Sequence, residues 1–220
     1  MKNKYLAWCG LLILTVLILT VVAYPQLPAL IPVHWDVQGQ INQYGPRWVM
    51  FVLGAGMMTA TVLLFVTLPR LSPKRFEVES FQVTYWYLML MIVMMTGYFY
   101  LMMLWAILAG PIDMNRAVVG GVALLFALIG NVMGKVRRNP WIGIRNPWTR
   151  ASERVWYASH RVAAKTMVAT ALLCLVGAFA GMPFWAALLL LLMGVIIPSA
   201  YSLYYYKKLE RRGELESSFN

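Results

Sequence analysis

The chain has 220 residues, of which 61% are hydrophobic and only 12% are charged. A soluble domain carries about 25% charged residues, so this composition excludes an ordinary soluble globular protein and makes lipid the solvent for much of the chain. The net charge is +11, but the basic residues are confined to alternate connecting segments, a pattern that indicates membrane topology and argues against direct binding of nucleic acid.

Apolar segments follow one another along the whole chain, and several are long enough to cross a membrane as helices. A bilayer core of about 30 Å requires about 20 apolar residues per helix, and these segments lack the polar–apolar alternation of barrel strands. We therefore predict an all-α, polytopic integral membrane protein with six transmembrane helices, at residues 5–23, 48–68, 83–108, 117–133, 162–180 and 184–206.

Lysine and arginine distinguish the two sides of the predicted bundle. All but two of the 19 basic residues lie in the N-terminal tail, the second and fourth connections and the C-terminal tail; the exceptions are Arg47 and Arg116. This alternation predicts that both termini are cytoplasmic, with the basic loops facing anionic lipid headgroups. The first apolar segment is longer than a signal-peptide core, so we expect it to remain as the first helix.

The chain divides most simply into three parts. We expect an N-terminal membrane half (1–110), a C-terminal membrane half (111–206) and a basic cytoplasmic tail (207–220). Each half has a long loop rich in proline, glycine and tryptophan after its first helix, on opposite faces of the membrane. Inverted repeats of this kind occur in transporters, but the halves share little residue-level similarity, which favours a coincidence of loop lengths.

The outer loop, residues 24–47, is interrupted by four prolines and two glycines, so we expect turns rather than a helix. It contains His34 and Asp36, but a hydrolytic zinc site needs three protein ligands, and the other histidine, His160, is predicted on the opposite face. We therefore predict no metal site and interpret His34 as a hydrogen-bonded loop residue. Because hydrolase motifs are also missing from the sequence, we expect no catalytic residue and no cofactor.

The inner loop reads RRNPWIGIRNPWTR over residues 137–150 and contains the tetrad Arg-Asn-Pro-Trp twice. Each proline moves the preceding residue out of helical geometry, and Gly143 between them permits a reversal of the chain. The two tryptophans suit the headgroup layer of a membrane. Thr149 is predicted to cap a helix that begins at Arg150.

The helix after this loop separates its residues between two faces. Glu153, Trp156 and His160 share one face, whereas Arg150, Arg154, Arg161 and Lys165 lie on another that should meet lipid phosphate. The first face would line a protein pocket or pack on the loop. The alternative, which the residues taken alone favour, is that the whole segment is an interfacial anchor.

Each of the two loops carries a recognisable residue pattern. The pattern of the outer loop consists of Ile31-Pro32-Val33-His34-Trp35, Gly39 and Tyr44-Gly45. The pattern of the inner loop consists of Gly130-Asn131, Gly134, Asn139, Gly143-Ile144-Arg145, Pro147-Trp148-Thr149, Glu153, Trp156, His160-Arg161 and Lys165. Together they resemble the SdpI-like bacterial immunity family, and the outer pattern is similar to that family's N-terminal domain of unknown function. The sequence departs from the family pattern at Asn146 and Ser159, where the family usually has threonine.

The resemblance implies a six-span protein of the bacterial cytoplasmic membrane that protects against a secreted, membrane-active peptide and signals its presence to a small cytoplasmic repressor. Members without a toxin partner also occur in the family. The implied outer binding site consists of Pro32, His34, Trp35, Asp36, Gly39 and Tyr44. The implied inner site consists of Asn131, Asn139, Gly143, Arg145, Pro147, Trp148, Thr149, Glu153, Trp156, His160 and Arg161.

Two other functions stay open at this point. A transporter or exporter of a small hydrophobic or peptide substrate would agree with the loop symmetry between the halves and would require a cavity near the middle of the membrane. A membrane-embedded hydrolase would use Glu153 and His160 as acid and base.

Overall fold

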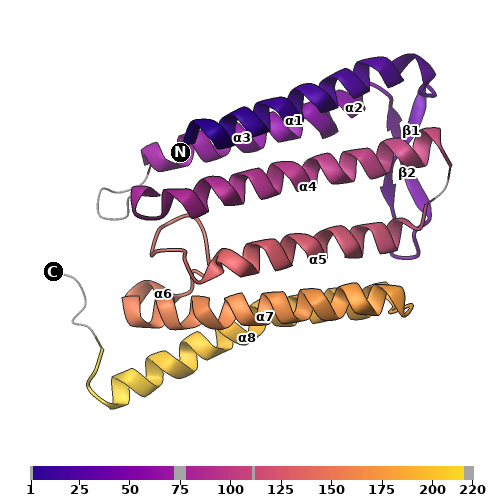
Figure 1. Cartoon of the computed structure of the whole chain (residues 1–220). Helices are drawn as coiled ribbons and strands as arrows, with labels where there is room; N and C mark the ends of the chain where they lie inside the picture. Colours follow the sequence, from indigo (N-terminus) through magenta and orange to yellow (C-terminus); the bar gives the residue numbers. More distant parts are fainter. Residues whose placement is uncertain (1, 72–77, 111, 216–220) are drawn as a thin grey trace.

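The computed structural model describes residues 2–71, 78–110 and 112–215, which are mostly helical (Figure 1). Within these residues, six helical spans are long and apolar enough to cross a membrane, so the prediction of an all-α, six-span membrane protein is confirmed. Five spans are single helices: α1 (Lys2–Ala23), α4 (Gln82–Leu108), α5 (Met114–Met133), α7 (Glu153–Phe179) and α8 (Phe184–Arg211).

The second span is composite. It consists of α2 (Val49–Phe51), a π-helical turn (Val52–Gly56) and α3 (Met57–Thr67), and a 3-10 turn at Leu68–Leu71 follows it. The remaining helical elements are short: 3-10 turns at Tyr24–Gln26 and Val78–Phe81, and α6 (Pro147–Ala151).

The π turn lies where the second span packs closely on two other helices. A Cβ atom at Gly54 would lie 2.7 Å from the ring of Tyr100 in α4 and 2.8 Å from Val16 in α1, so this approach requires glycine. The hydroxyls of Tyr100 and Thr20 are 2.6 Å apart and form a buried hydrogen bond between α4 and α1. Interhelical bonds of this kind, together with small residues, hold helices together in lipid.

The long helices run alongside one another, with α4 and α5 between the N-terminal helices and the pair α7 and α8 (Figure 1). One core cluster joins α1, α3 and α4 to the ends of α5 and α7, so it crosses the expected domain boundary at residue 110. The second cluster lies between α5, α7 and α8 and is built largely from small residues that allow close packing: Val119, Ala123, Ala171, Cys174, Ala187 and Leu191.

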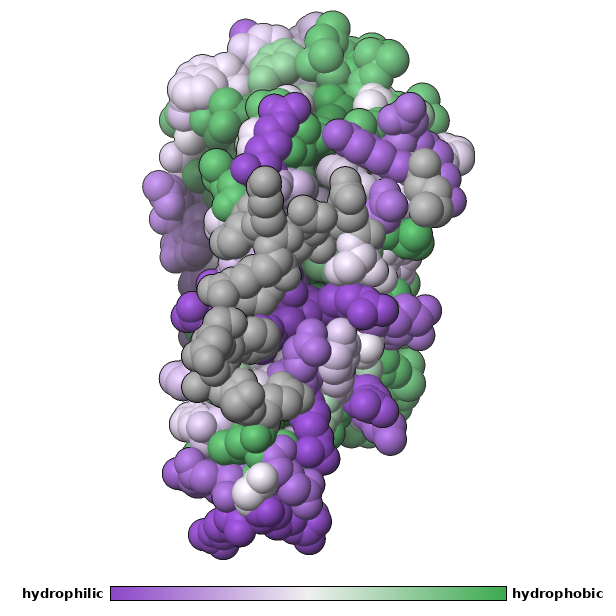
Figure 2. Space-filling model, turned by 90° about the vertical axis from the view of Figure 1, so that its left-hand side faces the viewer, coloured by the Kyte–Doolittle hydropathy of each residue, from purple (hydrophilic) through white to green (hydrophobic). Residues whose placement is uncertain are grey.

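The two ends of the bundle differ in character. One end carries a β-hairpin, and the other carries α6 and both ends of the chain (Figure 1). Figure 2 views the molecule from the end with the termini, where hydrophilic side chains cover much of the surface. Along the sides of the bundle, large apolar side chains such as Phe179 (92% exposed) face outward, as expected for helices surrounded by lipid.

Helix boundaries differ from the expected ones where polar residues extend a helix beyond its apolar segment. Helix α7 begins at Glu153 rather than at the predicted Arg150, which belongs to the separate helix α6, and it starts well before the apolar span predicted at residue 162. Ser152 Oγ accepts a hydrogen bond from the Val155 amide (3.3 Å) and caps its first turn. Asp113 caps α5 in the same way. Helix α8 continues to Arg211, so part of the expected basic tail belongs to the last transmembrane helix.

The outer loop is more regular than the expected set of turns. It forms an antiparallel hairpin of β1 (Leu30–Trp35) and β2 (Ile41–Pro46), with irregular register around His34. Sequence inspection missed these strands because Pro32 interrupts β1 and Gly45 and Pro46 interrupt β2, and such residues weaken a strand pattern.

Candidate functional site

The tip of the outer hairpin is organised by Asp36. Its carboxylate oxygen Oδ1 accepts hydrogen bonds from the amides of Gln38 and Gln40, each at 2.9 Å. Gly39 has φ +78°, a conformation that favours glycine in a tight turn. Both residues belong to the predicted outer site, and their first role is to fold the hairpin that carries the others.

The hairpin is attached to the helical bundle by a side chain from α5. Asn115 Nδ2 donates to the carbonyl oxygen of Val37 at 2.9 Å. Within the hairpin, His34 Nδ1 lies 2.6 Å from Asn42 Oδ1; because an amide oxygen only accepts, the imidazole donates here. The interpretation of His34 as a hydrogen-bonded loop residue is therefore confirmed.

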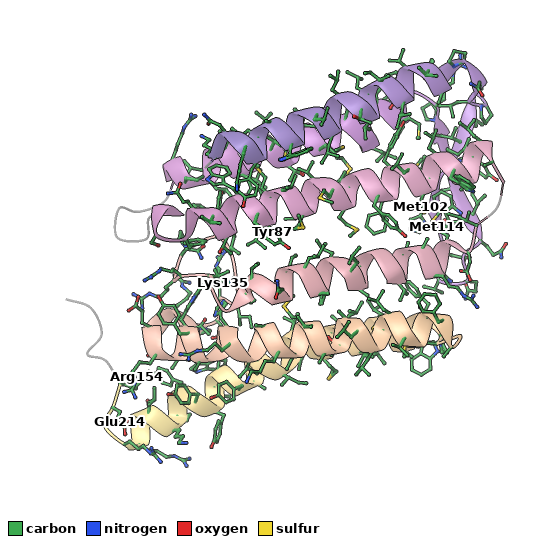
Figure 3. The ribbon with its side chains drawn as sticks, in the orientation of Figure 1. Tyr87, Met102, Met114, Lys135, Arg154 and Glu214 are labelled. Atoms are coloured by element: carbon green, nitrogen blue, oxygen red, sulfur yellow. The ribbon has the colours of Figure 1, made fainter. Side chains whose placement is uncertain are left out.

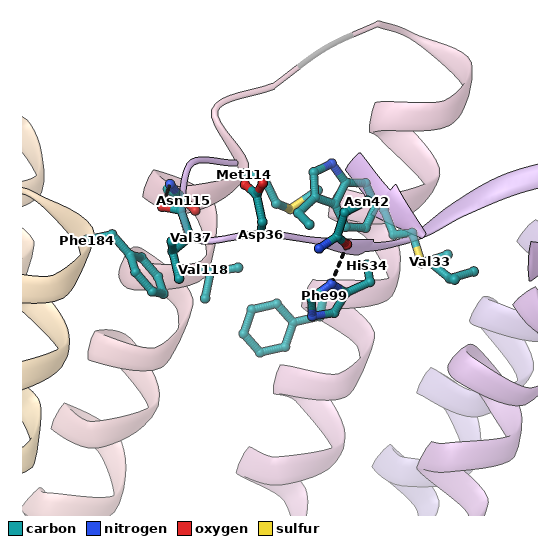
Figure 4. Close-up of a pocket in the computed structure, with 12 residues that line it drawn as sticks. Val33, His34, Asp36, Val37, Asn42, Phe99, Met114, Asn115, Val118 and Phe184 are labelled. Atoms are coloured by element: carbon teal, nitrogen blue, oxygen red, sulfur yellow. Dashed lines mark hydrogen bonds between the residues drawn. The ribbon is translucent and has the colours of Figure 1, made fainter. Parts of the chain in front are cut away.

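A cavity of about 620 Å³ lies between this hairpin and the bundle (Figure 4). Its polar groups come from the hairpin and from Asn115, and most of its remaining wall is apolar. A ligand site typically combines an apolar wall with a few such polar groups at a volume of about 300–1,000 Å³. The helical side chains on the wall are Phe99 and Met103 of α4, Met114, Asn115 and Val118 of α5, and Phe184 of α8.

The cavity unites only part of the predicted outer site. His34, Trp35 and Asp36 line it, whereas Pro32, Gly39 and Tyr44 are not on its wall, and Tyr44 is 58% exposed. Sequence reasoning missed the helical half of the cavity, since apolar residues within a transmembrane segment carry no signal that separates a cavity wall from a lipid-facing surface. No group of three metal-ligating side chains occurs in the part of the chain that the structure describes.

At the opposite end of the bundle, Asn139 organises the first half of the inner loop. Its Oδ1 accepts from the amides of Trp141 and Ile142, both at 2.7 Å. Its Nδ2 donates to the carbonyl oxygens of Arg137 (2.8 Å) and Ile142 (3.0 Å). Asparagine is one of the residues that bond their own backbone in turns, so Asn139 fixes the reversal before Gly143.

His160 joins the second half of the loop to α7. Its Nδ1 lies 2.8 Å from the carbonyl oxygen of Trp156, and its Nε2 accepts from the Ile144 amide at 3.0 Å. A carbonyl only accepts and an amide N–H only donates, so the ring is neutral with its proton on Nδ1. Gly143 has φ +109°, and a Cβ atom there would overlap His160 Nε2.

Trp156 completes this arrangement from the same helix. Its indole stacks on the His160 ring, with centroids 4.1 Å apart, and its Nε1 donates to the Val136 carbonyl oxygen at 2.8 Å. Trp156, His160 and Val136 are fully buried. The prediction that the Trp156 and His160 face packs on the loop is confirmed, but Glu153, assigned to the same face, is exposed.

The short helix α6 corrects the predicted cap. The N-cap is Asn146, and Thr149 is the third helical residue of a capping box rather than the cap of a helix beginning at Arg150. Asn146 Oδ1 accepts from the Thr149 amide at 3.0 Å, and Asn146 Nδ2 donates to Ser202 Oγ of α8 at 2.6 Å. Asn146, which stands where the family usually has threonine, therefore caps α6 and also bonds α8.

Other members of the predicted inner site lie on the surface. Arg145, Pro147 and Arg161 are exposed, Trp148 is half-buried, and Asn131 is exposed near the end of α5. Arg145 donates to the Trp141 carbonyl oxygen at 3.2 Å. The inner motif thus consists of a buried set of hydrogen-bonded residues and a basic outer surface.

Comparison with known proteins agrees with this division into an outer and an inner loop. Residues 135–202 match the SdpI/YfhL protein family, and residues 11–59 match a domain of unknown function, DUF1648. The immunity protein SdpI of Bacillus subtilis (strain 168) is 25% identical over 192 residues, which cover 86% of this chain and 90% of that protein.

The resemblance predicted from the two loops is therefore confirmed by both matches and by this relative. The chain is a multi-pass membrane protein. No solved structure matches it.

The SdpI/YfhL match begins at Lys135 and contains the inner loop, α6, α7 and most of α8. It includes every residue of the predicted inner site except Asn131. The DUF1648 match contains the outer hairpin and the composite second span as far as Thr59 in α3. The outer cavity therefore combines residues from the DUF1648 segment, from the family segment and from α4 and α5 between them.

Proposed function

We propose that this chain is an immunity protein of a bacterial cytoplasmic membrane that protects the cell from a secreted, membrane-active peptide. The similarity to the immunity protein of Bacillus subtilis supports the class of function. The distribution of basic residues supports an orientation with both termini in the cytoplasm and the hairpin outside. In this orientation the outer cavity faces the side from which the peptide arrives.

The outer cavity is the proposed contact for the peptide, and its geometry is the observation that carries this proposal. An apolar side chain of a membrane-active peptide fits a mainly apolar space of about 620 Å³. His34 and Asn42 supply polar groups on the same wall, where they would bond the peptide backbone. Capture at this site would hold the peptide at the surface before it inserts into lipid.

Filling the cavity tests the proposal. Val118→Phe places a ring into the space next to the hairpin, whereas Val176→Phe makes the same change on the lipid-facing surface of α7, where Val176 is 68% exposed. In sensitive cells with equal membrane levels of each protein, we expect Val118→Phe to lose resistance to the peptides secreted by the native host, and Val176→Phe to keep it. Full resistance with Val118→Phe would refute the cavity as the contact.

We further propose that the basic inner surface signals to a small cytoplasmic repressor, as the family resemblance implies. Arg145 and Arg161 are exposed beside the buried pair Trp156 and His160, so a partner can reach the arginines without disturbing the packed loop. With Arg145→Ala we expect unchanged resistance and a weakened response of a repressor-controlled reporter. An unchanged reporter response would exclude this surface.

The two alternative functions receive less support. The apolar cavity lies at the hairpin end of α4 and α5 rather than near their middle, where a transporter holds its substrate. A hydrolase that uses His160 as a base would need a free ring nitrogen, but both nitrogens are bonded to the backbone and the ring is fully buried.

A further inference from the structure

A second cavity, of about 680 Å³, lies at the end of the bundle that carries the termini. It is bounded by the first turn of α4 on one side and by the segment after α5 on the other, with Tyr157 of α7 contributing to the wall. Figure 3 shows Lys135 at this end of α5, facing the beginning of α4. The cavity therefore lies between the N-terminal and C-terminal halves of the chain.

Two cations line this cavity. Lys135 and Arg137 are both exposed, and among the described residues no carboxylate lies within ion-pair distance of either. Other basic residues at the same end do form ion pairs, for example Arg154 with Glu214 at 3.2 Å. Lys135 and Arg137 are therefore available for an anion that approaches the cavity from outside.

The opposite wall supplies uncharged hydrogen-bond donors. The 27-residue helix α4 begins in this wall without a side-chain cap, and its dipole favours negative charge near its first turn. Thr84 lines the same cavity and is only 8% exposed, so its hydroxyl can donate to an oxyanion bound in the cavity.

The buried part of the inner motif holds the cationic wall in place. Trp156 Nε1 bonds the carbonyl oxygen of Val136, and Asn139 Nδ2 bonds that of Arg137, both at 2.8 Å. Since Val136 is fully buried, the backbone between Lys135 and Arg137 is fixed on both sides. This explains what the buried part of the motif does without a ligand of its own: it pre-organises two cations opposite the start of α4.

We propose that this cavity binds the phosphate of an anionic phospholipid. Lys135, Arg137, Thr84 and the first turn of α4 would surround the phosphate oxygens. The apolar side chains of Phe81 and Val83, which share the wall, suit the glycerol and upper acyl carbons better than they suit a free phosphate ion. Basic pockets between transmembrane helices on the cytoplasmic side are a known form of lipid recognition. The site is independent of the outer cavity and of the proposed immunity function.

The test measures the thermal unfolding midpoint of the full chain in neutral detergent while phosphatidylglycerol is added. A ligand that binds the folded state raises the midpoint according to its concentration and affinity. We expect phosphatidylglycerol to raise it, and phosphatidylcholine and inorganic phosphate to have little effect. In Lys135→Gln/Arg137→Gln the lipid concentration needed for the same shift should rise about tenfold or more, since two charge-assisted contacts are lost.

Two further variants separate the site from general effects of charge. Lys208→Gln/Arg211→Gln removes two cations from α8 at the same end of the bundle but outside the cavity. This control variant should respond to the lipid like the native protein. Thr84→Val keeps the charges and shape of the site and should also weaken the response to the lipid.

Three results would overturn the proposal. The lipid response of the Lys135→Gln/Arg137→Gln protein could equal that of the native protein, or the control variant could lose the response to the same extent. Equal stabilisation by inorganic phosphate would assign the cavity to a soluble phosphate instead of a lipid. Both cationic side chains are exposed and the loop is held through backbone atoms, so the double variant should fold and give a clear answer.

Discussion

Gly143→Ala is the sharpest perturbation of the inner loop. Gly143 has φ +109°, and a Cβ atom there would overlap His160 Nε2, the atom that accepts the Ile144 amide. The chain offers a matched control in Gly110, which has φ +116° and no heavy atom within 4 Å of an added Cβ. Gly110→Ala therefore shares the backbone strain of Gly143→Ala without the collision.

Two free-energy costs are expected, one from backbone strain and one from the lost hydrogen bond to His160. Backbone strain for alanine at such a φ costs about 1–3 kcal/mol at either position. Displacing His160 leaves the Ile144 amide without its acceptor, which costs a further amount of about 1–3 kcal/mol for a buried group. We therefore expect Gly143→Ala to lower the free energy of unfolding by about 2–6 kcal/mol, and by about 1–3 kcal/mol more than Gly110→Ala.

Reversible unfolding of the full chain in mixed detergent micelles, followed by tryptophan fluorescence, measures both variants. The double variant Gly143→Ala/His160→Ala adds a second check, because removing the ring also removes the collision, so its cost should be smaller than the sum of the single costs. Equal destabilisation by Gly143→Ala and Gly110→Ala, or strict additivity in the double variant, would refute the contact between Gly143 and His160 as the reason for glycine.

Three other predictions each remove the hydrogen bonds of one side chain. Trp156→Phe leaves the buried Val136 carbonyl oxygen without its donor, and should lower the free energy of unfolding by about 1–3 kcal/mol in the same assay; no loss would mean that this bond does not hold the loop. Tyr100→Phe removes the 2.6 Å contact with Thr20, and should cost only about 0.6 kcal/mol, the average for interhelical bonds in membrane proteins; a cost of several kcal/mol would contradict that assignment. Asp36→Ala removes the carboxylate oxygen that accepts both amides of the hairpin turn, so hydrogen exchange at the amides of residues 38 and 40 should become faster while exchange in the helices is unchanged; unaltered protection at the turn would contradict the role given to Asp36.

The membrane-spanning part of the fold could be predicted from the sequence because apolar length alone determines it. The exact boundaries could not, since caps set them: the sequence predicted one helix from Arg150, whereas α6 ends at Ala151 and Ser152 caps α7, which begins at Glu153. The hairpin was missed because Pro32 and Gly45 obscure a strand pattern and because the pairing depends on partners in two separate segments. Neither segment has a clear strand pattern of its own, and the strands form because the two segments pair with each other.

The inner site could be located from its sequence motif, but the roles of its residues could not. Periodicity placed Glu153 with Trp156 and His160, yet the helix begins at Glu153 itself, so this residue remains exposed while the other two are covered by the loop. The motif also gave no sign of the cavity opposite it, because that cavity is completed by Thr84 and the start of α4, far away in the sequence.

The central claim, that this chain confers immunity, is tested most directly by the concentration of the native host's secreted peptides that stops growth of a sensitive bacterium. The comparison is between cells that express the full chain in their membrane and cells that carry the empty vector. The account predicts a clearly higher inhibitory concentration for cells with the protein, and a return toward the vector value with Val118→Phe. Equal inhibitory concentrations for the two strains, with the native protein present in the membrane, would contradict it.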